Sequence, residues 1–223
     1  MMHHSLHPHA PATDGENAPA LDIPACAPML ERLETRRSSP LRGLAEPGPT
    51  EEELRRLLTL AARVPDHGRL VPWRFIVLAG TARGGLGTRL DALYARQNPD
   101  LPPAKAQMWT EYLMRAPVTV VLVSCPDPAA KVPEWNQLLS AGAAGMALTA
   151  GAVAMGFATQ WLLKWPGRDP EAAALLGVGS GERIAGFIHI GRPTRITEDR
   201  PRPALDAVVR FWSPDQSMSN DTP

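Results

Sequence analysis

The chain has 223 residues, in which 23 lysine and arginine side chains balance 23 aspartate and glutamate side chains. This length suits one large domain or two small ones. A hydrophobic content of 44% allows a sizeable core, which excludes a wholly disordered or collagen-like chain. The formal net charge of zero argues against bulk electrostatic capture of nucleic acid, which needs a basic surplus.

The two ends of the chain are predicted to lie outside a single folded domain. Residues 1–28 are rich in proline, alanine and polar residues and lack the basic start and apolar run of a secretory signal. We therefore expect a disordered N-terminal extension over 1–28, a domain over 29–212 and a flexible C-terminal tail over 213–223. Cys26 and Cys125 form neither a disulfide framework nor a zinc pattern, which indicates a reducing, cytoplasmic setting.

The first half of the domain is predicted to be mainly helical. Residues 29–37 place Met29, Leu30 and Leu33 on one face, which favours a short amphipathic helix. Thr50 and Glu53 form a capping box, which predicts a helix over 50–63. A strand over 73–79, a helix to about residue 96 and a second helix over 103–115 are expected to follow.

The second half adds strands around one long helix. Residues 118–124 are a continuous, mostly β-branched run that predicts a strand buried on both faces. A long helix rich in alanine and glycine should end near Gly156, followed by a strand over 158–164, a short helix over 170–176 and a strand over 183–190. Strands separated by helices indicate an α/β or α+β layered domain.

The long helix lies in a run, residues 138–163, that carries no charged side chain. A membrane-spanning helix needs about 20 strongly apolar residues, whereas this run is mostly alanine and glycine with polar residues interspersed. We therefore expect a buried helix of a soluble domain and no membrane partner. Its small residues would let another backbone approach closely, either within the subunit or across a dimer.

Several catalytic motifs are absent from the sequence. The glycine-rich segment 80–87 has neither the GK[ST] ending of a phosphate-binding loop nor a G-x-G-x-x-G order. The segment 179–181 is in the wrong frame for a nucleophile elbow. With no H-E-x-x-H and no Cys/His cluster, we expect no metal site and no catalytic side chain of the hydrolase, kinase or metalloenzyme kind.

Two segments concentrate groups that bind anions. Arg36, Arg37 and Ser38 lie at the C-terminal end of the first helix, where adjacent guanidinium groups can clamp a phosphate, or where arginines can simply satisfy the helix dipole. Residues 63–73 place two arginines, an aspartate and His67 in a turn fixed by prolines and a glycine. That turn either collects ligand groups or is a hydrogen-bonded turn with solvated arginines.

The combination of these segments resembles the FMN-dependent nitroreductase family, in particular its compact, YdjA-like branch of NAD(P)H nitroreductases. The matching motifs are R-R-S at 36–38, P-D-H-G-R-x-x-P-W at 65–73 and G-F-x-T-x-W at 156–161. The segments K-V-P-E-W at 131–135 and S-A-G at 140–142 agree with the same branch. The resemblance runs from about residue 29 to residue 212.

The resemblance implies an α+β, nitroreductase-like fold with a central, mainly antiparallel sheet flanked by helices, and a homodimer with FMN at the dimer interface. It assigns Arg36, Arg37 and Ser38 to the FMN phosphate, and Arg63 and His67 to the flavin. A segment after the long helix would lie along the FMN: Trp161, Leu162 and Leu163. The end of the helix would bind the nicotinamide cofactor: Gly151, Ala152, Val153, Ala154, Met155 and Gly156.

Two departures from related sequences bear on the site. Val71 stands where many relatives have a glutamine, and Leu162 and Leu163 replace a polar Arg-Ser pair, so the resemblance implies a more apolar substrate pocket here. In the tail, Arg200 and Arg202 are candidates for additional phosphate charge.

The implied function is an FMN-dependent oxidoreductase that transfers hydride from NAD(P)H through the flavin to an electron-poor acceptor, such as a nitroaromatic or a quinone. In such enzymes the chemistry belongs largely to the cofactor, while the protein supplies position and electrostatics. Arg63, and after it His67, would stabilise negative charge on the reduced flavin. The alternative is a non-catalytic flavin-binding or sensing protein.

Overall fold

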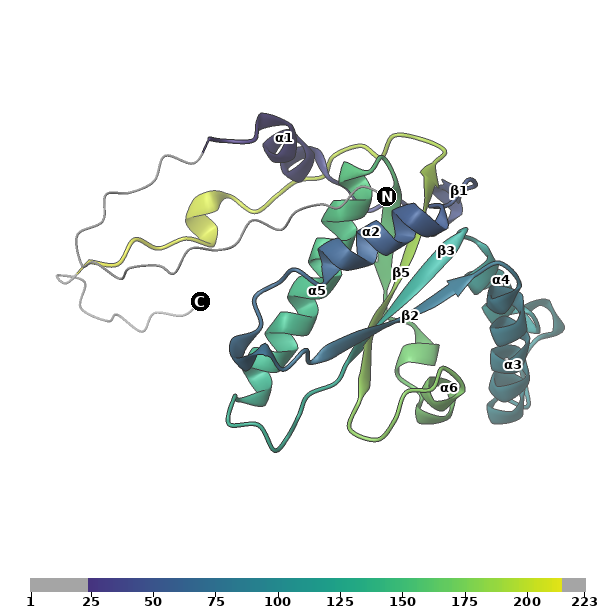
Figure 1. Cartoon of the computed structure of the whole chain (residues 1–223). Coiled ribbons are helices and arrows are strands. Elements are labelled where there is room, and N and C mark those ends of the chain that lie inside the picture. The colour runs from purple at the N-terminus through teal and green to yellow at the C-terminus, as the bar shows by residue number, and fades with distance from the viewer. Residues whose placement is uncertain (1–23, 214–223) are drawn as a thin grey trace, which may run out of the picture.

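A computed structural model of the chain describes residues 24–213 (Figure 1). The helices are α1 (Ala27–Thr35), α2 (Glu51–Ala61), α3 (Thr81–Gln97), α4 (Met108–Met114), α5 (Glu134–Ala154) and α6 (Pro170–Leu175). The strands are β1 (Leu44–Ala45), β2 (Trp73–Ala79), β3 (Val118–Ser124), β4 (Ala158–Leu162) and β5 (Arg183–Pro193).

The strands form one sheet in the order β1–β5–β3–β2, and β4 also pairs with β5. Every pairing among the described residues is antiparallel. The long strand β5 therefore lies beside β3 along one edge and beside β4 and then β1 along the other. This arrangement confirms the expected helix-flanked, mainly antiparallel sheet.

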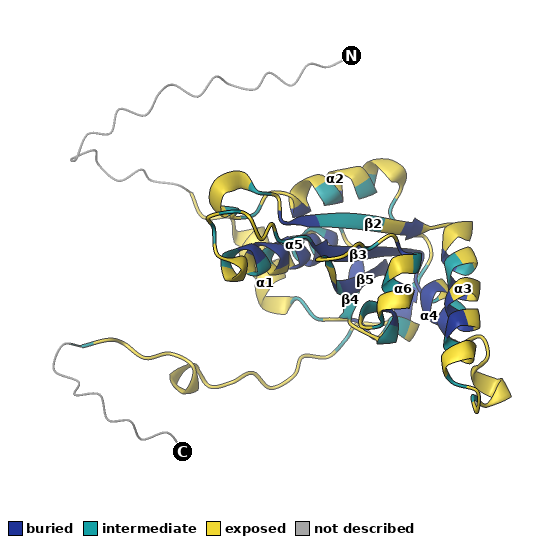
Figure 2. Cartoon of the chain, turned by 90° about the horizontal axis from the view of Figure 1, so that it is seen from below, coloured by how far each residue is buried: buried dark blue, intermediate teal, exposed yellow. Residues whose placement is uncertain are grey.

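Helices cover both faces of the sheet, so the domain has three layers (Figure 2). The alternation of side chains along β3 explains this, because Val120 and Leu122 belong to the core cluster with α2 and α5, whereas Val121 and Val123 belong to the cluster with α3, α4 and α6. All of β3 is buried, as its continuous β-branched run predicted.

Helix α5 packs its buried face on the sheet and on α2. Among residues 24–213, α5 is the helix whose length and apolar composition would allow it to cross a membrane. The core helix of a soluble protein can have the same length and composition. Its contacts with Leu57, Leu122 and Trp161 agree with the buried helix that the sequence predicts.

Some boundaries differ from the sequence predictions. Helix α1 begins at Ala27, with Pro28 in its first turn, two residues before the expected start; residues 1–23 and 214–223 of the expected tails lie outside the described residues. The helix expected over 103–115 divides into a 3-10 turn and α4. Asp91 of α3 explains where α4 begins, because its carboxylate accepts hydrogen bonds from the backbone N–H groups of Trp109 and Thr110.

The short strand β1 was not predicted. It has two residues, too few for a periodic pattern, and it forms because Leu44 and Ala45 pair with the end of β5 at Pro193 and Arg192. After β5 the chain leaves the sheet, and residues 195–213 extend from the domain with largely exposed side chains (Figures 1 and 2).

Candidate functional site

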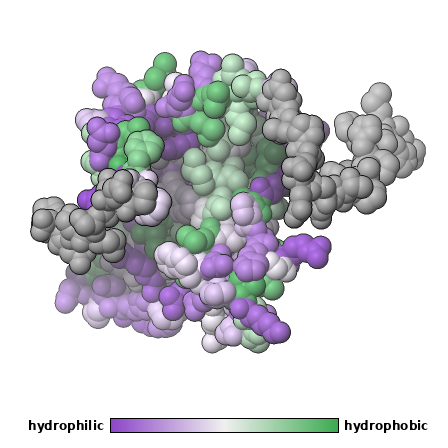
Figure 3. Space-filling view, turned by 90° about the vertical axis from the view of Figure 1, so that its left-hand side faces the viewer, coloured by the Kyte–Doolittle hydropathy of each residue, from purple (hydrophilic) through white to green (hydrophobic). Residues whose placement is uncertain are grey.

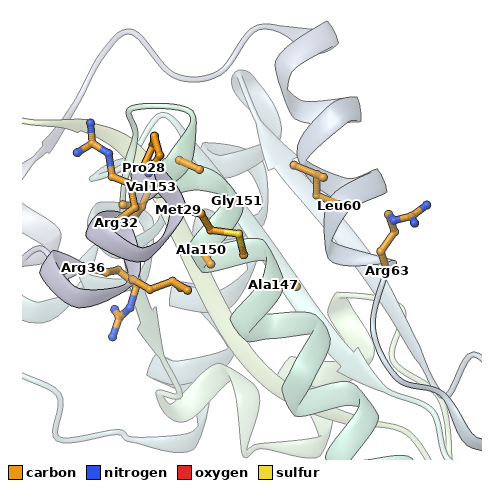
Figure 4. A pocket seen from close by; sticks show the side chains of 12 residues that line it. Pro28, Met29, Arg32, Arg36, Leu60, Arg63, Ala147, Ala150, Gly151 and Val153 are labelled. Carbon is orange, nitrogen blue, oxygen red and sulfur yellow. The ribbon is translucent and has the colours of Figure 1, made fainter. Parts of the chain in front are cut away.

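A cleft of about 690 Å³ lies between α1, α5 and the end of α2 (Figure 4). We call it the α1–α5 cleft. Met29 and Leu33, four residues apart and so on one face of α1, line one side of it, and small residues of α5 line another. The residues that line it are Pro28, Met29, Arg32, Leu33, Arg36, Leu60, Arg63, Ala147, Ala150, Gly151, Val153 and Ala154.

The walls of the cleft are apolar, and its charged side chains are three arginines. Figure 4 shows Arg32 and Arg36 on the α1 side and Arg63 on the α2 side, with guanidinium groups that point in different directions. Guanidinium groups bind phosphate and carboxylate well, and apolar walls suit a ring system. The donor set therefore fits an anionic ligand with an apolar part, such as a flavin nucleotide, although within one chain the three arginines do not converge on one point.

The R-R-S segment lies beside β4, because the buried Ser39 donates its N–H to the carbonyl oxygen of Thr159 (2.9 Å). Arg36 lines the α1–α5 cleft. Arg37 instead turns to the C-terminal segment, where it donates to the backbone carbonyl of Glu198 and pairs with Asp199. Ser38 is exposed. Within the single chain, the adjacent side chains of Arg36 and Arg37 therefore contact different parts of the structure, the cleft and the C-terminal segment.

The turn between α2 and β2 is held from within by Asp66. Its two carboxylate oxygens accept the N–H groups of Leu70 (3.2 Å) and Val71 (2.8 Å). These bonds support an unusual backbone, since Val71 has φ of 50°, a left-handed conformation that is unfavourable for a β-branched residue. The side chain of Val71 is exposed, so the hydrogen bonds to Asp66, rather than burial of this side chain, hold the conformation.

The same turn is tied to the N-terminal end of α5. The hydroxyl of Ser140 donates to the carbonyl of Pro65 (2.8 Å) and accepts from the indole N–H of Trp73 (3.1 Å). The side-chain amide of Asn136 lies 3.2 Å from Nδ1 of His67. The turn is therefore a rigid support that presents the exposed side chains of Arg63 and His67.

The segment after α5 is tightly packed. Gly156, with φ of 81°, ends the helix, and its carbonyl accepts a hydrogen bond from Arg192 (2.8 Å). Trp161 donates its indole N–H to the carbonyl of Ala185 (3.1 Å), and its ring lies against Gly145 and Gly186, where a Cβ would meet it at 2.2 and 1.9 Å. The Trp161 indole is therefore a packing element between α5 and β5, while Leu163 is exposed.

The predicted site residues thus form two groups in one chain. One group lies around the C-terminal end of α5 and β4: the R-R-S segment, 151–156 and 161–163. The other is the turn with His67, which is bonded to Asn136 at the opposite end of α5. Asn136 and Ala152 are 16 residues apart, which corresponds to about 24 Å along a helix. Arg63 lies on the opposite side of the cleft from Arg36, and Ala152 itself is buried in the core.

Several cleft residues were missed by the sequence reasoning. Arg32 precedes Arg36 by one helical turn, so the spacing of four residues was the signal that could have found it. The spacing of Met29 and Leu33 indicates an apolar helix face, but it does not indicate that this face is the wall of a cleft. Leu60 has no such signal, because only the packing of α2 beside α5 brings it there.

The titratable groups with shifted pKa values, among residues 24–213, lie outside the cleft. Burial raises the pKa of the Cys125 thiol to about 11, so it is not a thiolate nucleophile at neutral pH. Hydrogen bonds from Arg74 hold the pKa of Glu182 at about 2. In the same part of the chain no group of three or more His, Cys, Asp or Glu side chains is placed to hold a metal ion.

Comparisons with known proteins agree with this architecture. A crystallised nitroreductase-like family protein from Bacillus cereus superposes with a TM-score of 0.72 at 18% identity, covering 86% of this chain and 99% of that one. The nitroreductase NfnB of Sphigopyxis sp. strain HMH superposes with a TM-score of 0.64 at 20% identity, covering 83% and 99%. The fold is therefore the nitroreductase-like fold.

The sequence matches are closer. The model of the Nitroreductase family matches residues 33–192. YdjA of Escherichia coli (strain K12), named as an NAD(P)H nitroreductase, is 35% identical over 165 residues, which cover 74% of this chain and 87% of YdjA. A protein of Haemophilus influenzae with the same kind of name is 36% identical over 164 residues, covering 73% and 86%. The chain belongs to the nitroreductase family and is an oxidoreductase.

Proposed function

We propose that this oxidoreductase uses FMN to pass hydride from NAD(P)H to an electron-poor acceptor such as a nitroaromatic or a quinone. The observation that carries the proposal is the apolar α1–α5 cleft bordered by Arg36 and Arg63, within the segment that matches the family. The names of similar proteins support it, since NfnB is described as FMN- and NADPH-dependent and YdjA as an NAD(P)H nitroreductase. Bound FMN would accept a hydride and deliver it to the acceptor.

In this proposal the residues of the chain bind and orient the cofactor. Arg36, Arg37 and Ser38 hold the phosphate, since guanidinium groups form charge-assisted hydrogen bonds with phosphate oxygens. Arg63 and His67, presented by the rigid turn, approach the flavin, where a positive charge or a hydrogen-bond donor stabilises negative charge on the ring. No side chain serves as a covalent nucleophile.

The remaining assignments concern the two substrates. The end of α5, from Gly151 to Gly156, would receive the nicotinamide cofactor. Trp161, Leu162 and Leu163 would lie along the FMN; Trp161 would act through its backbone because its indole is used in packing. The exposed Leu163 supports an apolar surface for an aromatic acceptor.

We further propose that the protein is a homodimer with FMN at its interface. Trp135, Leu139 and Met146 form an exposed apolar stripe along α5, at spacings of one and two helical turns. Figure 3 shows the molecule from the left-hand side of the view in Figure 1. Hydrophobic residues gather across the middle of this surface. Exposed apolar patches of this kind mark interfaces. A second copy would also supply its own turn with His67, which lies far from the R-R-S group within one chain.

The proposal includes the organisation of the chain and its location. The match to the family over residues 33–192 supports a catalytic domain over 29–212 with terminal extensions outside it. The thiols of Cys26 and Cys125 are both free, which supports a reducing, cytoplasmic location.

The test is cofactor retention and turnover. The purified protein should carry FMN and oxidise NAD(P)H in the presence of a nitroaromatic or a quinone. The double variant Arg36→Ala/Arg37→Ala should lose FMN, whereas Arg55→Ala, which removes an exposed arginine paired with Glu51 on α2, should keep it. Full retention of FMN by the double variant would refute the phosphate assignment, and a flavin-containing protein without turnover would indicate a binding or sensing role.

A further inference from the structure

Arg37 is held by the C-terminal segment. Its Nη1 donates to the carbonyl oxygen of Glu198 and lies 3.4 Å from Oδ1 of Asp199. The same Asp199 oxygen accepts from Nη2 of Arg202 at 2.9 Å. Two guanidinium groups, from positions far apart in the sequence, thus converge on one carboxylate oxygen.

These contacts anchor the segment to the domain. Within the described range, the hydrogen bonds that join residues 195–213 to the rest of the structure are those from Arg37. The other hydrogen bonds of the segment are internal to it, such as the pair between Arg202 and Asp199. If Arg37 also binds a ligand anion, that anion and Asp199 therefore compete for the same guanidinium group.

Asp199 is a suitable competitor for that anion. A carboxylate oxygen and a phosphate oxygen make the same charge-assisted hydrogen bonds with a guanidinium group. The Arg37 side chain is 18% exposed, whereas that of Asp199 is 67% exposed, so the carboxylate can turn into solvent at a smaller loss of packing than the guanidinium group. A phosphate at Arg37 would be repelled by a nearby carboxylate, because like charges disfavour each other at short range.

We propose that Asp199 occupies the place of a phosphate oxygen at Arg37 and is displaced when FMN binds, so that the C-terminal segment sets the affinity for the cofactor. This inference rests on the proposed function, which assigns the FMN phosphate to Arg37. The Asp199 carboxylate stays charged near neutral pH, since a hydrogen bond from the N–H of Arg200, and then Arg202 and Arg37, lower its pKa. The competition is therefore present under physiological conditions.

The experiment compares FMN with riboflavin, which has the same ring but no phosphate. Dissociation constants of both ligands are measured with the apo-protein, by quenching of flavin fluorescence, for the wild type and for Asp199→Asn and Asp199→Ala. Both variants should bind FMN about two- to fivefold more tightly at low ionic strength, the range expected for loss of an exposed ion pair. Riboflavin affinity should not change, and the gain for FMN should shrink as salt screens the charges.

Glu198→Gln is the matched control. It removes the neighbouring charge but leaves the backbone carbonyl that contacts Arg37, so its FMN affinity should remain that of the wild type. Unchanged or weaker FMN binding in both Asp199 variants, or an equal change for riboflavin, would overturn the inference while leaving the proposed function intact. A wild-type protein that binds FMN no better than riboflavin would overturn the phosphate assignment and the inference together.

Discussion

His189 lies in the centre of β5 and is fully buried. Its Nδ1 is 2.9 Å from the hydroxyl of Thr119, its ring packs edge-on against Tyr112, and its Nε2 has no partner among the described residues. Burial lowers the pKa of His189 from 6.5 to about 4, because the surrounding core disfavours the charged imidazolium.

Because of His189, we expect the free energy of unfolding to decrease in mild acid. Because its pKa is lower in the folded state than in the unfolded state, the unfolded chain binds more protons between the two values, so the free energy of unfolding falls as pH drops from 6.5 to about 4. The full loss would be about 3 kcal/mol. Denaturant unfolding of the wild type and of His189→Gln across this range measures it.

The variant should show a shallower slope over the same interval. Glu182 contributes in a lower window, since its pKa is lowered from 4.5 to about 2 and its stabilisation is lost only below 4.5. Equal slopes for wild type and variant between pH 4.5 and 6.5 would contradict the assignment to His189.

At the scale of elements, α2 depends on its N-terminal capping box. The hydroxyl of Thr50 accepts the N–H of Glu53 (3.2 Å), and the Glu53 carboxylate accepts the N–H of Thr50 (2.8 Å). Thr50→Ala should therefore destabilise the protein by about 1 kcal/mol in thermal or denaturant unfolding. Thr59→Ala on the same helix, whose hydroxyl only bonds back to Arg55, is the control and should change stability much less.

Two glycines of α5 should respond in opposite directions to alanine. A Cβ at Gly145 would stand 2.2 Å from the Trp161 ring, whereas a Cβ at Gly142 would meet nothing within 4 Å. Gly145→Ala should destabilise by about 1–3 kcal/mol through overpacking. Within the monomer, Gly142→Ala should be neutral or stabilise by up to about 1 kcal/mol, because alanine favours the helix. Comparable unfolding midpoints for the two variants would show that Trp161 does not require a small residue on α5.

At the scale of the whole molecule, the homodimer can be tested with two methionines. Met146 on the apolar stripe of α5 is 41% exposed, and Met114 on α4, in the opposite layer, is 46% exposed. Met146→Glu should raise the dimer dissociation constant by about tenfold or more, since it would bury a charge at the interface. Met114→Glu should leave it unchanged. Sedimentation velocity over a concentration series distinguishes the two, and equal effects would exclude the α5 stripe as the interface.

Elements with strong local signals were predictable from the sequence. The capping box of Thr50 and Glu53 predicted the start of α2, and the β-branched run predicted a buried β3, because hydrogen bonding within one turn and side-chain periodicity are properties of short segments. The division of the 103–115 helix was not predictable, since it depends on Asp91 of another helix reaching the N–H groups of Trp109 and Thr110.

The candidate site also combines features that the sequence predicts with features that depend on the tertiary structure. The sequence by itself determined the order of the longer helices and strands and the clusters of arginines, because these follow from local composition and spacing. Its motifs also carried the resemblance to the family. Only the tertiary structure decided that Arg36 faces the α1–α5 cleft while Arg37 turns to Asp199, and that Arg32 and Leu60 join the lining. The physical reason is that the direction of a side chain depends on segments distant in sequence, here α5, β4 and residues 194–213, which fold beside it.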